Sequence, residues 1–277
     1  MTACFLVIDK PVGITSHDVV AVLRAVTGIK KVGHTGTLDP FATGVLPVAF
    51  GPATRLIQYL DESVKIYDMT LALGTEMDTG DPTGEVVRTA PVPELERDAV
   101  LAVLEGFLGD QMQTPPAFSA VKKDGKPLYH YARKGETVKV DARPITINAL
   151  ELLELGEGML RIRLTCSRGT YARVLANDIA EALGTVGHLV QLRRERSGPF
   201  VEAQAMSFQQ VADLASGDPS LSWQQVLMAR RFGHERVSWR HRDEVRQELL
   251  GSGLSTLQAL DHLPIASVGE DQVRLVQ

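Results

Sequence analysis

Short apolar segments of two different periods are interspersed along this chain, and that mixture limits the folds it can adopt. Residues 65–73 and 160–167 place apolar side chains at every second position, as half-buried strands do. Residues 16–27 and 171–183 instead repeat their apolar positions at helical spacing, and Gly28 follows the first of them as a stop signal. Because these segments do not follow a strict strand–helix–strand rhythm, we expect an α+β fold with a mixed central sheet flanked by helices.

Local signals refine this interpretation. Ser16 and Thr170 are the predicted N-caps of the two helices, and Pro93 suits the first position of another. Residues 29–44 have no period and are rich in Gly and Thr, so we expect a loop there. The remaining apolar runs predict strands at 5–8, 45–50 and near 86, and helices at 54–61 and 93–108.

The bulk composition is that of an ordinary globular protein, with 44% hydrophobic and 23% charged residues. No apolar run approaches the roughly 20 residues that span a bilayer, and the first residues lack the pattern of a signal peptide. Cys4 and Cys166 lie in strand-like stretches, and we expect buried free thiols. These features predict a cytoplasmic protein with no membrane partner.

The charge distribution differs from the net charge of −5. Residues 111–200 carry 14 basic and 9 acidic side chains. Within this stretch, residues 111–148 are expected to form an irregular basic insertion with a short helix at 128–134 and strands beyond it. A local positive field can bind phosphates on a protein that is acidic elsewhere, although charge alone fits a solvated basic face equally well.

Familiar metal and cofactor motifs are missing from the sequence. The seven histidines show no HxxxH or HxH spacing, and there is no CxxC, P-loop or GxGxxG motif. We therefore predict no metal and no cofactor. Residues 78–80 (DTG) imitate the signature of aspartic proteases, but a working pair needs a second such carboxylate. A loop aspartate that stabilises a turn accounts for Asp78 better.

The most informative segment is residues 33–44 (GHTGTLDPFATG). Its glycines allow a tight path close to a ligand. Pro40 disfavours the helical region for Asp39 and so holds it extended, which fixes the direction of a carboxylate. Composition alone would favour a simple Asp-Pro turn.

The sequence of this loop resembles that of the catalytic loop of the bacterial tRNA pseudouridine-55 synthases, the TruB type of pseudouridine synthase. Five further segments resemble the motifs of that family in the same order, over about two-thirds of the chain. They are residues 10–16 (KPVGITS), 65–67 (KIY), 115–122 (PPAFSAVK), 167–173 (SRGTYAR) and 192–194 (LRR).

The resemblance implies a mixed, mostly antiparallel sheet and assigns roles to six residues. Asp39 would be the nucleophile, and Arg173 would be its ion-pair partner. Tyr67 would stack on the target base, Tyr171 and Leu192 would line the uracil pocket, and His34 would contact the displaced nucleotides. Without the resemblance, simpler explanations would serve equally well. Tyr67 and Leu192 could be core residues, His34 could cap its own loop, and Arg173 could lie on the surface.

The implied substrate is tRNA, whose target uridine lies in the T-arm and must leave its stack to reach the pocket. We expect the insertion to clamp this arm with its cations, namely Lys122, Lys123, Lys126, Arg133 and Lys134. We expect a monomer that works without guide RNA. The open alternatives are a pseudouridine synthase for another RNA site and a non-catalytic tRNA-binding or folding module.

Two regions are expected along the chain: a catalytic domain at 1–204 and a C-terminal region at 205–277. Bacterial members of the family usually carry a C-terminal β-barrel of the PUA type. Residues 257–264 (LQALDHLP) resemble the lead-in to that barrel, but only 13 residues follow them. We therefore expect a truncated or atypical PUA-like appendage of short helices, with one strand at 272–276.

Overall fold

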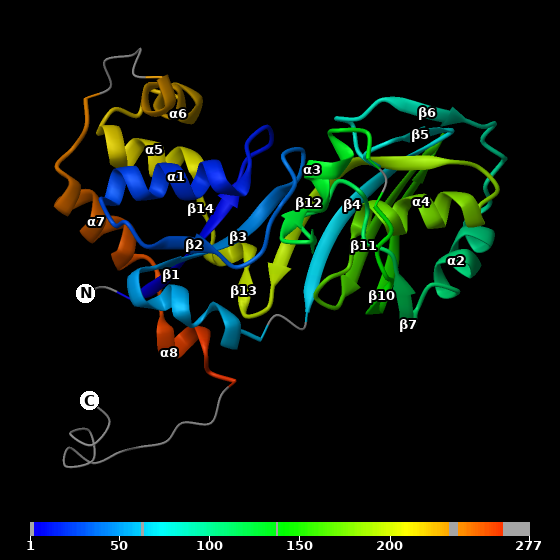
Figure 1. Cartoon of the computed structure of the whole chain (residues 1–277), viewed down its shortest axis with the longest axis horizontal. Coiled ribbons are helices and arrows are strands. Elements are labelled where there is room, and N and C mark those ends of the chain that lie inside the picture. Colours follow the sequence, from blue (N-terminus) through cyan, green and yellow to red (C-terminus); the bar gives the residue numbers. More distant parts are fainter. Residues whose placement is uncertain (1–2, 62–63, 137, 233–237, 263–277) are drawn as a thin grey trace.

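The computed structural model describes residues 3–61, 64–136, 138–232 and 238–262. Among these residues, eleven strands form one sheet with the main order β14-β1-β3-β12-β4-β11-β10-β7 (Figure 1). Only the β1–β14 and β12–β3 pairs are parallel, which confirms the expected mixed, mostly antiparallel sheet.

The strands of this sheet are β1 (Cys4–Lys10), β2 (Val32–His34), β3 (Thr43–Phe50), β4 (Lys65–Leu73), β7 (Gly109–Gln113), β10 (Arg143–Gly156), β11 (Met159–Cys166), β12 (Gly187–Ser197), β13 (Phe200–Val201), β14 (Met206–Ser207) and β15 (Leu254–Ser255). Two small hairpins lie outside it: β5 (Thr75–Met77) with β6 (Val86–Thr89), and β8 (Lys122–Lys123) with β9 (Lys126–Pro127). The helices are α1 (Ser16–Thr27), α2 (Arg97–Glu105), α3 (Leu128–Ala132), α4 (Ala172–Ala182), α5 (Phe208–Ser216), α6 (Trp223–Phe232), α7 (Arg242–Gly251) and α8 (Thr256–Ala259), with 3-10 turns η1 (Gly51–Arg55), η2 (Ile57–Tyr59) and η3 (Glu202–Gln204).

The sheet has two halves that meet at β12. The first half contains β1, β2 and β3 with α1, α5 and α7; the second contains β4, β11, β10 and β7 with α2 and α4 (Figure 1). The junction is narrow, because β12 pairs with β3 only through Arg193↔Thr43 and Arg194↔Gly44. A Cβ on Gly44, whose φ is +99°, would lie 2.3 Å from the carbonyl oxygen of Arg194. Glycine is therefore required where the two halves touch.

Strict alternation correctly predicted β4 and β11, two strands of the core. On β4 and β11, the side chains of Met69, Leu71, Leu160, Ile162 and Leu164 have no solvent exposure. The two cysteines are buried free thiols, as expected.

Both predicted helix caps are wrong by one residue. Thr15 caps α1 in a reciprocal capping box with Asp18, while Ser16 already lies in the helix. Tyr171 is the N-cap of α4 and makes no side-chain cap. The hydroxyl of Thr170, the predicted cap, instead donates to the carbonyl of Ser167 at 3.0 Å. Gly28 ends α1 in the left-handed conformation, as predicted.

Other differences follow from local chemistry. The helix expected at 54–61 is two 3-10 turns, since Gly51 and Pro52 open a tight bend rather than a regular helix. The helix expected from Pro93 begins at Arg97, after an extended stretch. The loop expected at 29–44 contains the short strand β2, and β7 was not anticipated in a polar segment.

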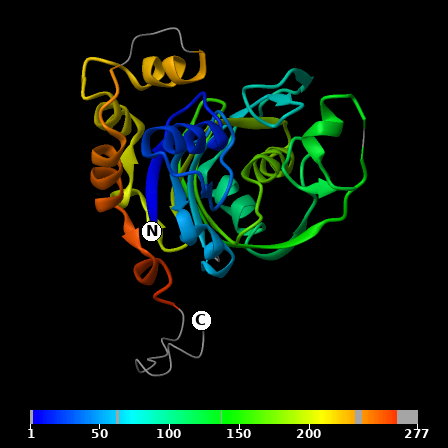
Figure 2. The ribbon, with the colours of Figure 1, turned by 60° about the vertical axis from the view of Figure 1, so that its left-hand side comes forward.

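The C-terminal helices share the core of the first half. Phe208 and Val211 of α5 and Leu249 of α7 are buried in the same apolar cluster as α1. Figure 2 shows these helices along the outer side of the first half, with the green segment around α3 standing away from the sheet. The strand expected at 272–276 lies outside the described residues. Among those described, no helix is long and apolar enough to cross a bilayer.

Candidate active site

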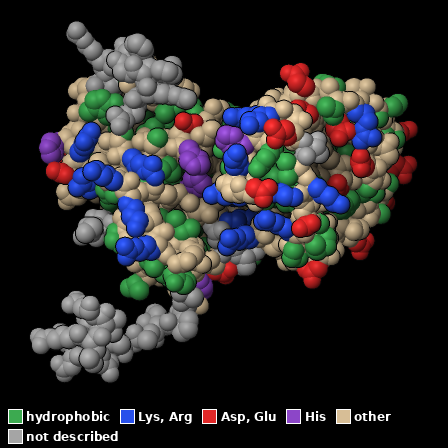
Figure 3. Space-filling view, viewed as in Figure 1, with side chains coloured by type: hydrophobic (Ala, Val, Ile, Leu, Met, Phe, Trp, Pro, Cys, Tyr) green, Lys and Arg blue, Asp and Glu red, His purple; other side chains and the backbone are tan. Residues whose placement is uncertain are grey.

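A cavity of about 430 Å³ lies between the two halves, where Figure 3 shows the surface hollowed. Both halves and the junction strand contribute to its wall. The lining residues are Thr35, Gly36, Thr37, Leu38, Asp39, Lys65, Tyr67, Ser119, Ala120, Val121, Arg143, Arg168, Gly169, Thr170, Tyr171, Ala172, Arg173, Leu192 and Arg194. Five of the six residues given roles above are therefore brought together, and His34 is not among them.

Side chains on both sides of the Asp39 loop hold it in place. The hydroxyl of Ser16 accepts from the backbone N–H of Leu38 at 2.9 Å and contacts its carbonyl at 3.1 Å. The ammonium of Lys10, which is fully buried, donates to the carbonyls of Ile14 at 2.8 Å and Pro40 at 3.4 Å. Burial lowers the pKa of Lys10 to about 8, against the opposing effect of Asp39. The start of α1 and the loop thus form one unit.

Arg194, of the LRR segment, fixes the other side of the loop. Its side chain is 2% exposed and has no carboxylate partner among the described residues. Its nitrogens donate to the carbonyls of Val45 at 2.8 Å, Gly36 at 3.1 Å and Thr37 at 3.4 Å. Sequence reasoning gave this residue no role, although a doubled arginine in an apolar strand could have indicated a buried cation.

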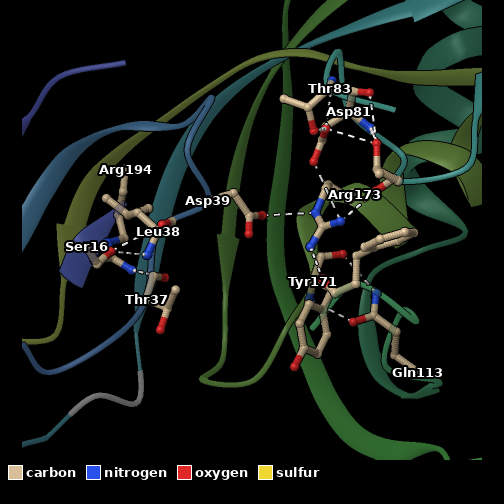
Figure 4. A network of polar contacts seen from close by, with 12 residues as sticks. Ser16, Thr37, Leu38, Asp39, Asp81, Thr83, Gln113, Tyr171, Arg173 and Arg194 are labelled. Atoms are coloured by element: carbon tan, nitrogen blue, oxygen red, sulfur yellow. Dashed lines mark hydrogen bonds and ion pairs between the residues drawn. The ribbon is translucent and has the colours of Figure 1, made fainter. Parts of the chain in front are cut away.

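Asp39 points across the cavity to Arg173 (Figure 4). Arg173 Nε lies 2.9 Å from Asp39 Oδ2, so the ion pair that the resemblance implied is present. The Arg173 side chain is 5% exposed, while about a third of the Asp39 side chain is open, at 34%. Arg173 also donates to the carbonyls of Thr79 at 2.6 Å and Phe118 at 2.8 Å. One guanidinium therefore joins the Asp39 loop, the β5–β6 hairpin and the insertion.

A second carboxylate, Asp81, lies 3.6 Å from Arg173 Nη1 on the far side of the guanidinium. It is 4% exposed and accepts from the Thr79 hydroxyl at 2.9 Å, the Thr83 N–H at 3.0 Å and the Thr83 hydroxyl (Figure 4). Sequence reasoning missed this residue. The signal was an aspartate between two threonines, TGDPT, a pattern that can hold a buried carboxylate. Asp78 is exposed and accepts from the N–H of Glu85 at 2.8 Å, as expected for a turn.

The electrostatics of Asp39 are set by opposing effects. Burial raises the pKa of the carboxyl most, and the Asp81 charge raises it further. Arg173 lowers it by charge and by hydrogen bonding, and Lys10 lowers it as well. The guanidinium thus favours the ionised form that chemistry would need, and its Nε contacts one carboxylate oxygen, Oδ2.

The aromatic residues of the cavity are fixed by their backbones. Tyr67 stands on β4 opposite Arg194 and Leu164, and burial raises the pKa of its phenol. Tyr171 is clamped by Gln113, whose amide accepts from the Tyr171 N–H at 2.8 Å and donates to its carbonyl at 3.2 Å. Burial raises the Tyr171 pKa too. These rings and Leu192 supply flat apolar surface.

His34 lies on β2, behind the loop. Its ring is edge-on to His17 with centroids 5.2 Å apart, and its buried Nδ1 has no hydrogen-bond partner. Burial, with smaller effects from His17 and Arg194, lowers the pKa of His34 to about 4. The imidazole is therefore neutral at physiological pH.

The five cations expected to form a clamp are exposed and lie outside the wall of the 430 Å³ cavity. Lys122, Lys123 and Lys126 belong to the β8–β9 hairpin, and the Arg133 guanidinium lies 5.4 Å from the ring centre of Tyr129. A neighbouring cavity of about 230 Å³ is lined by Lys122, Lys123 and Arg143 among others.

The cavity wall can hold the Asp39 carboxylate against one planar ring of a ligand. Among the described residues there is no group of three or more His, Cys, Asp or Glu side chains that could hold a metal ion. The wall offers a carboxylate that a guanidinium contacts, the face of a tyrosine and an excess of cations. A carboxylate in this setting can act as a nucleophile or abstract a proton.

Known proteins share both the sequence and the fold. Residues 24–172 match the model of the TruB family pseudouridylate synthase N-terminal domain, and residues 173–228 match that of the tRNA pseudouridylate synthase B C-terminal domain. A Geobacter sulfurreducens protein named tRNA pseudouridine synthase B is 51% identical over 76% of this chain and 69% of its own length. A protein of the same name in Francisella tularensis subsp. novicida is 47% identical over 76% of this chain and 70% of its own length.

Two solved structures superpose over 94% of this chain. A chain in the crystal structure of a Cbf5-Nop10-Gar1 complex does so with a TM-score of 0.63 and 29% identity. A chain in an H/ACA RNP bound to a substrate RNA containing 2′-deoxyuridine does so with a TM-score of 0.61 and 26% identity. The present chain spans 62% of the length of each of these.

Proposed function

The chain belongs to the TruB family of pseudouridylate synthases, and we propose that it isomerises the uridine at position 55, in the T-arm of tRNA, to pseudouridine. Conversion of uridine to pseudouridine in tRNA is the activity for which its relatives are named. The observation that carries the proposal is the Asp39 carboxylate, held by the buried Arg173 in a cavity whose wall also contains Tyr67.

The reaction suits these residues. The C1′–N1 bond of uridine breaks, the base turns, a C1′–C5 bond forms, and the proton of C5 is exchanged for one on N1. The isomerisation involves no net oxidation and consumes no water, so the proposal includes no metal and no cofactor. Asp39 would either attack the sugar or the base as a covalent nucleophile, or abstract a sugar proton as the base departs. Both routes need the ionised form that Arg173 favours.

The cavity wall supports the remaining roles that we propose. Tyr67 would stack on the flipped base, and Tyr171 and Leu192 would line the pocket for uracil. The volume of about 430 Å³ is within the range of small-molecule sites and suits a single nucleotide. His34 would contact nucleotides displaced from the T-loop rather than the flipped base, since it lies outside the wall.

We further propose that the exposed cations of the insertion clamp the T-arm, and that the enzyme is a cytoplasmic monomer working without guide RNA. Residues 1–204 would be the catalytic domain and 205–277 an atypical PUA-like region. Every residue of the cavity wall precedes Ser197, which supports that division. The C-terminal helices would still be needed for folding, because their apolar side chains pack in the same core as α1.

Incubation with unmodified tRNA transcript, followed by carbodiimide mapping of pseudouridine, tests the proposal. We expect a single modified uridine, at position 55. Modification at another position would instead favour a different RNA target. Tight tRNA binding without any modification would favour a non-catalytic module.

A further inference from the structure

The cavity wall carries more positive charge than its single carboxylate balances. Besides Asp39, the charged residues of the wall are Lys65, Arg143, Arg168, Arg173 and Arg194. Three of these five cations are engaged by the protein itself: Arg173 by Asp39, Arg194 by loop carbonyls, and Lys65 by the hydroxyl of Ser197 at 2.7 Å. Two cations remain to be explained.

Arg143 and Arg168 are both exposed, and across the described ranges neither forms an ion pair or a side-chain hydrogen bond. Two other arginines of the same half of the sheet, Arg161 and Arg163, do have partners. Arg161 binds Asp68 through two nitrogens at 2.6 and 3.0 Å, and Arg163 binds Glu195 in the same way at 3.0 and 3.1 Å. Arg143 and Arg168, by contrast, line the cavity without such a partner among the described residues.

Both are attached to well-fixed backbone on either side of Tyr171. Arg143 opens β10 opposite Gln113, the residue that clamps the Tyr171 backbone. Arg168 lies in the turn between β11 and α4, where the Thr170 hydroxyl donates to the Ser167 carbonyl. Arg143 also lines the neighbouring cavity with Lys122 and Lys123, so positive charge continues from the active site to the insertion. Figure 3 shows Lys and Arg side chains around this groove.

We propose that Arg143 and Arg168 bind the two phosphates that flank the flipped uridine. A nucleotide inserted into the cavity leaves its 5′ and 3′ phosphates at the mouth, and a guanidinium offers a phosphate two parallel hydrogen bonds. Fixing both phosphates sets the sugar against Asp39, while Tyr67 receives the base. These arginines are therefore positioning residues, and the inference rests on the proposed function.

The first test uses Arg143→Gln and Arg168→Gln with a T-arm stem-loop RNA. Each variant should raise the Kd on the order of tenfold, as expected for loss of a charge-assisted hydrogen bond. Each should also reduce the slope of log affinity against log salt by about 0.7–0.9, the contribution of one phosphate. Arg161→Gln, which removes an exposed but paired arginine, should leave the slope unchanged. An unchanged slope in both cavity variants overturns the proposal.

The second test locates the phosphates. A neutral methylphosphonate is placed on the 5′ or the 3′ side of the target uridine, and binding is measured with each enzyme. Each methylphosphonate should weaken RNA binding by the wild type. It should cause no further loss of affinity in the variant that lacks the arginine binding that phosphate. Equal losses in wild type and both variants would show that these arginines contact other phosphates. Pseudouridine formation by the wild type on the unmodified stem-loop reports separately on the proposed function.

Discussion

Replacement of Arg173 by lysine, which keeps the charge, is the sharpest probe of the active site. The guanidinium serves Asp39, the Thr79 carbonyl and the Phe118 carbonyl at 2.6–2.9 Å while only 5% exposed. A lysine nitrogen cannot reach all three. Losing two hydrogen bonds to a charged group should cost about 3 kcal/mol of folding free energy. In a protein of this size, that corresponds to a fall in Tm of roughly 6–10 °C.

The rate should suffer more than stability. Without the contact from Nε, the Asp39 carboxylate loses its fixed direction. We therefore expect the single-turnover rate to fall by roughly 100-fold or more, as when one oriented donor is removed from an active site. The assay is single-turnover pseudouridine formation at saturating enzyme, well below the lowered Tm. Arg163→Lys is the matched control, because Arg163 forms a similar paired contact with Glu195 away from the cavity. A rate within about threefold of wild type for Arg173→Lys would refute the reasoning.

Asp39→Asn should abolish turnover while leaving the tRNA Kd within about tenfold, because an amide is neither nucleophile nor base; measurable single-turnover conversion would contradict this. Since burial raises the pKa of Asp39 and the ionised form is required, the rate should fall on acidification at a pH above the ordinary aspartate value, and a rate that stays flat down to about pH 4 would argue against it. Neutralising Lys122, Lys123 and Lys126 together should reduce the salt dependence of tRNA binding, and an unchanged slope would place the clamp elsewhere. Treatment with EDTA should not reduce activity, whereas loss that zinc restores and magnesium does not would reveal a metal.

Periodicity predicted the parts of the fold in which one face is buried and the other exposed. It located β4 and β11 because every second side chain enters the core, and α1 because its apolar positions lie on one side. It missed β7, whose polar sequence pairs along the edge of β10 without entering the core in the same pattern. The cap of α1 was displaced by one residue because Thr15 and Ser16 are both able to cap, and only the backbone geometry decides between them.

The residues of the site were predictable only where a motif named them. Asp39, Tyr67 and Arg173 came from the resemblance, and the structure places all three in one cavity wall. Asp81 and Arg194 have their effect through contacts with segments distant in the sequence, and no local pattern of charge reveals such contacts. Arg194 binds loop carbonyls and Asp81 contacts the Arg173 guanidinium, and these contacts can be recognised only in the folded structure.

The same long-range contacts determine when the active site can exist. Arg194 reaches the carbonyl of Gly36 across 158 residues of chain, and Arg173 reaches Thr79 across 94. Contacts of such sequence separation carry a large loop-closure cost and tend to form late in folding. During synthesis, the Asp39 loop is complete long before the arginines that orient it have left the ribosome. A nascent or partly refolded chain therefore contains the Asp39 carboxylate but lacks the arginine contacts that orient it. Catalytic competence should appear only when the two halves of the sheet have packed together.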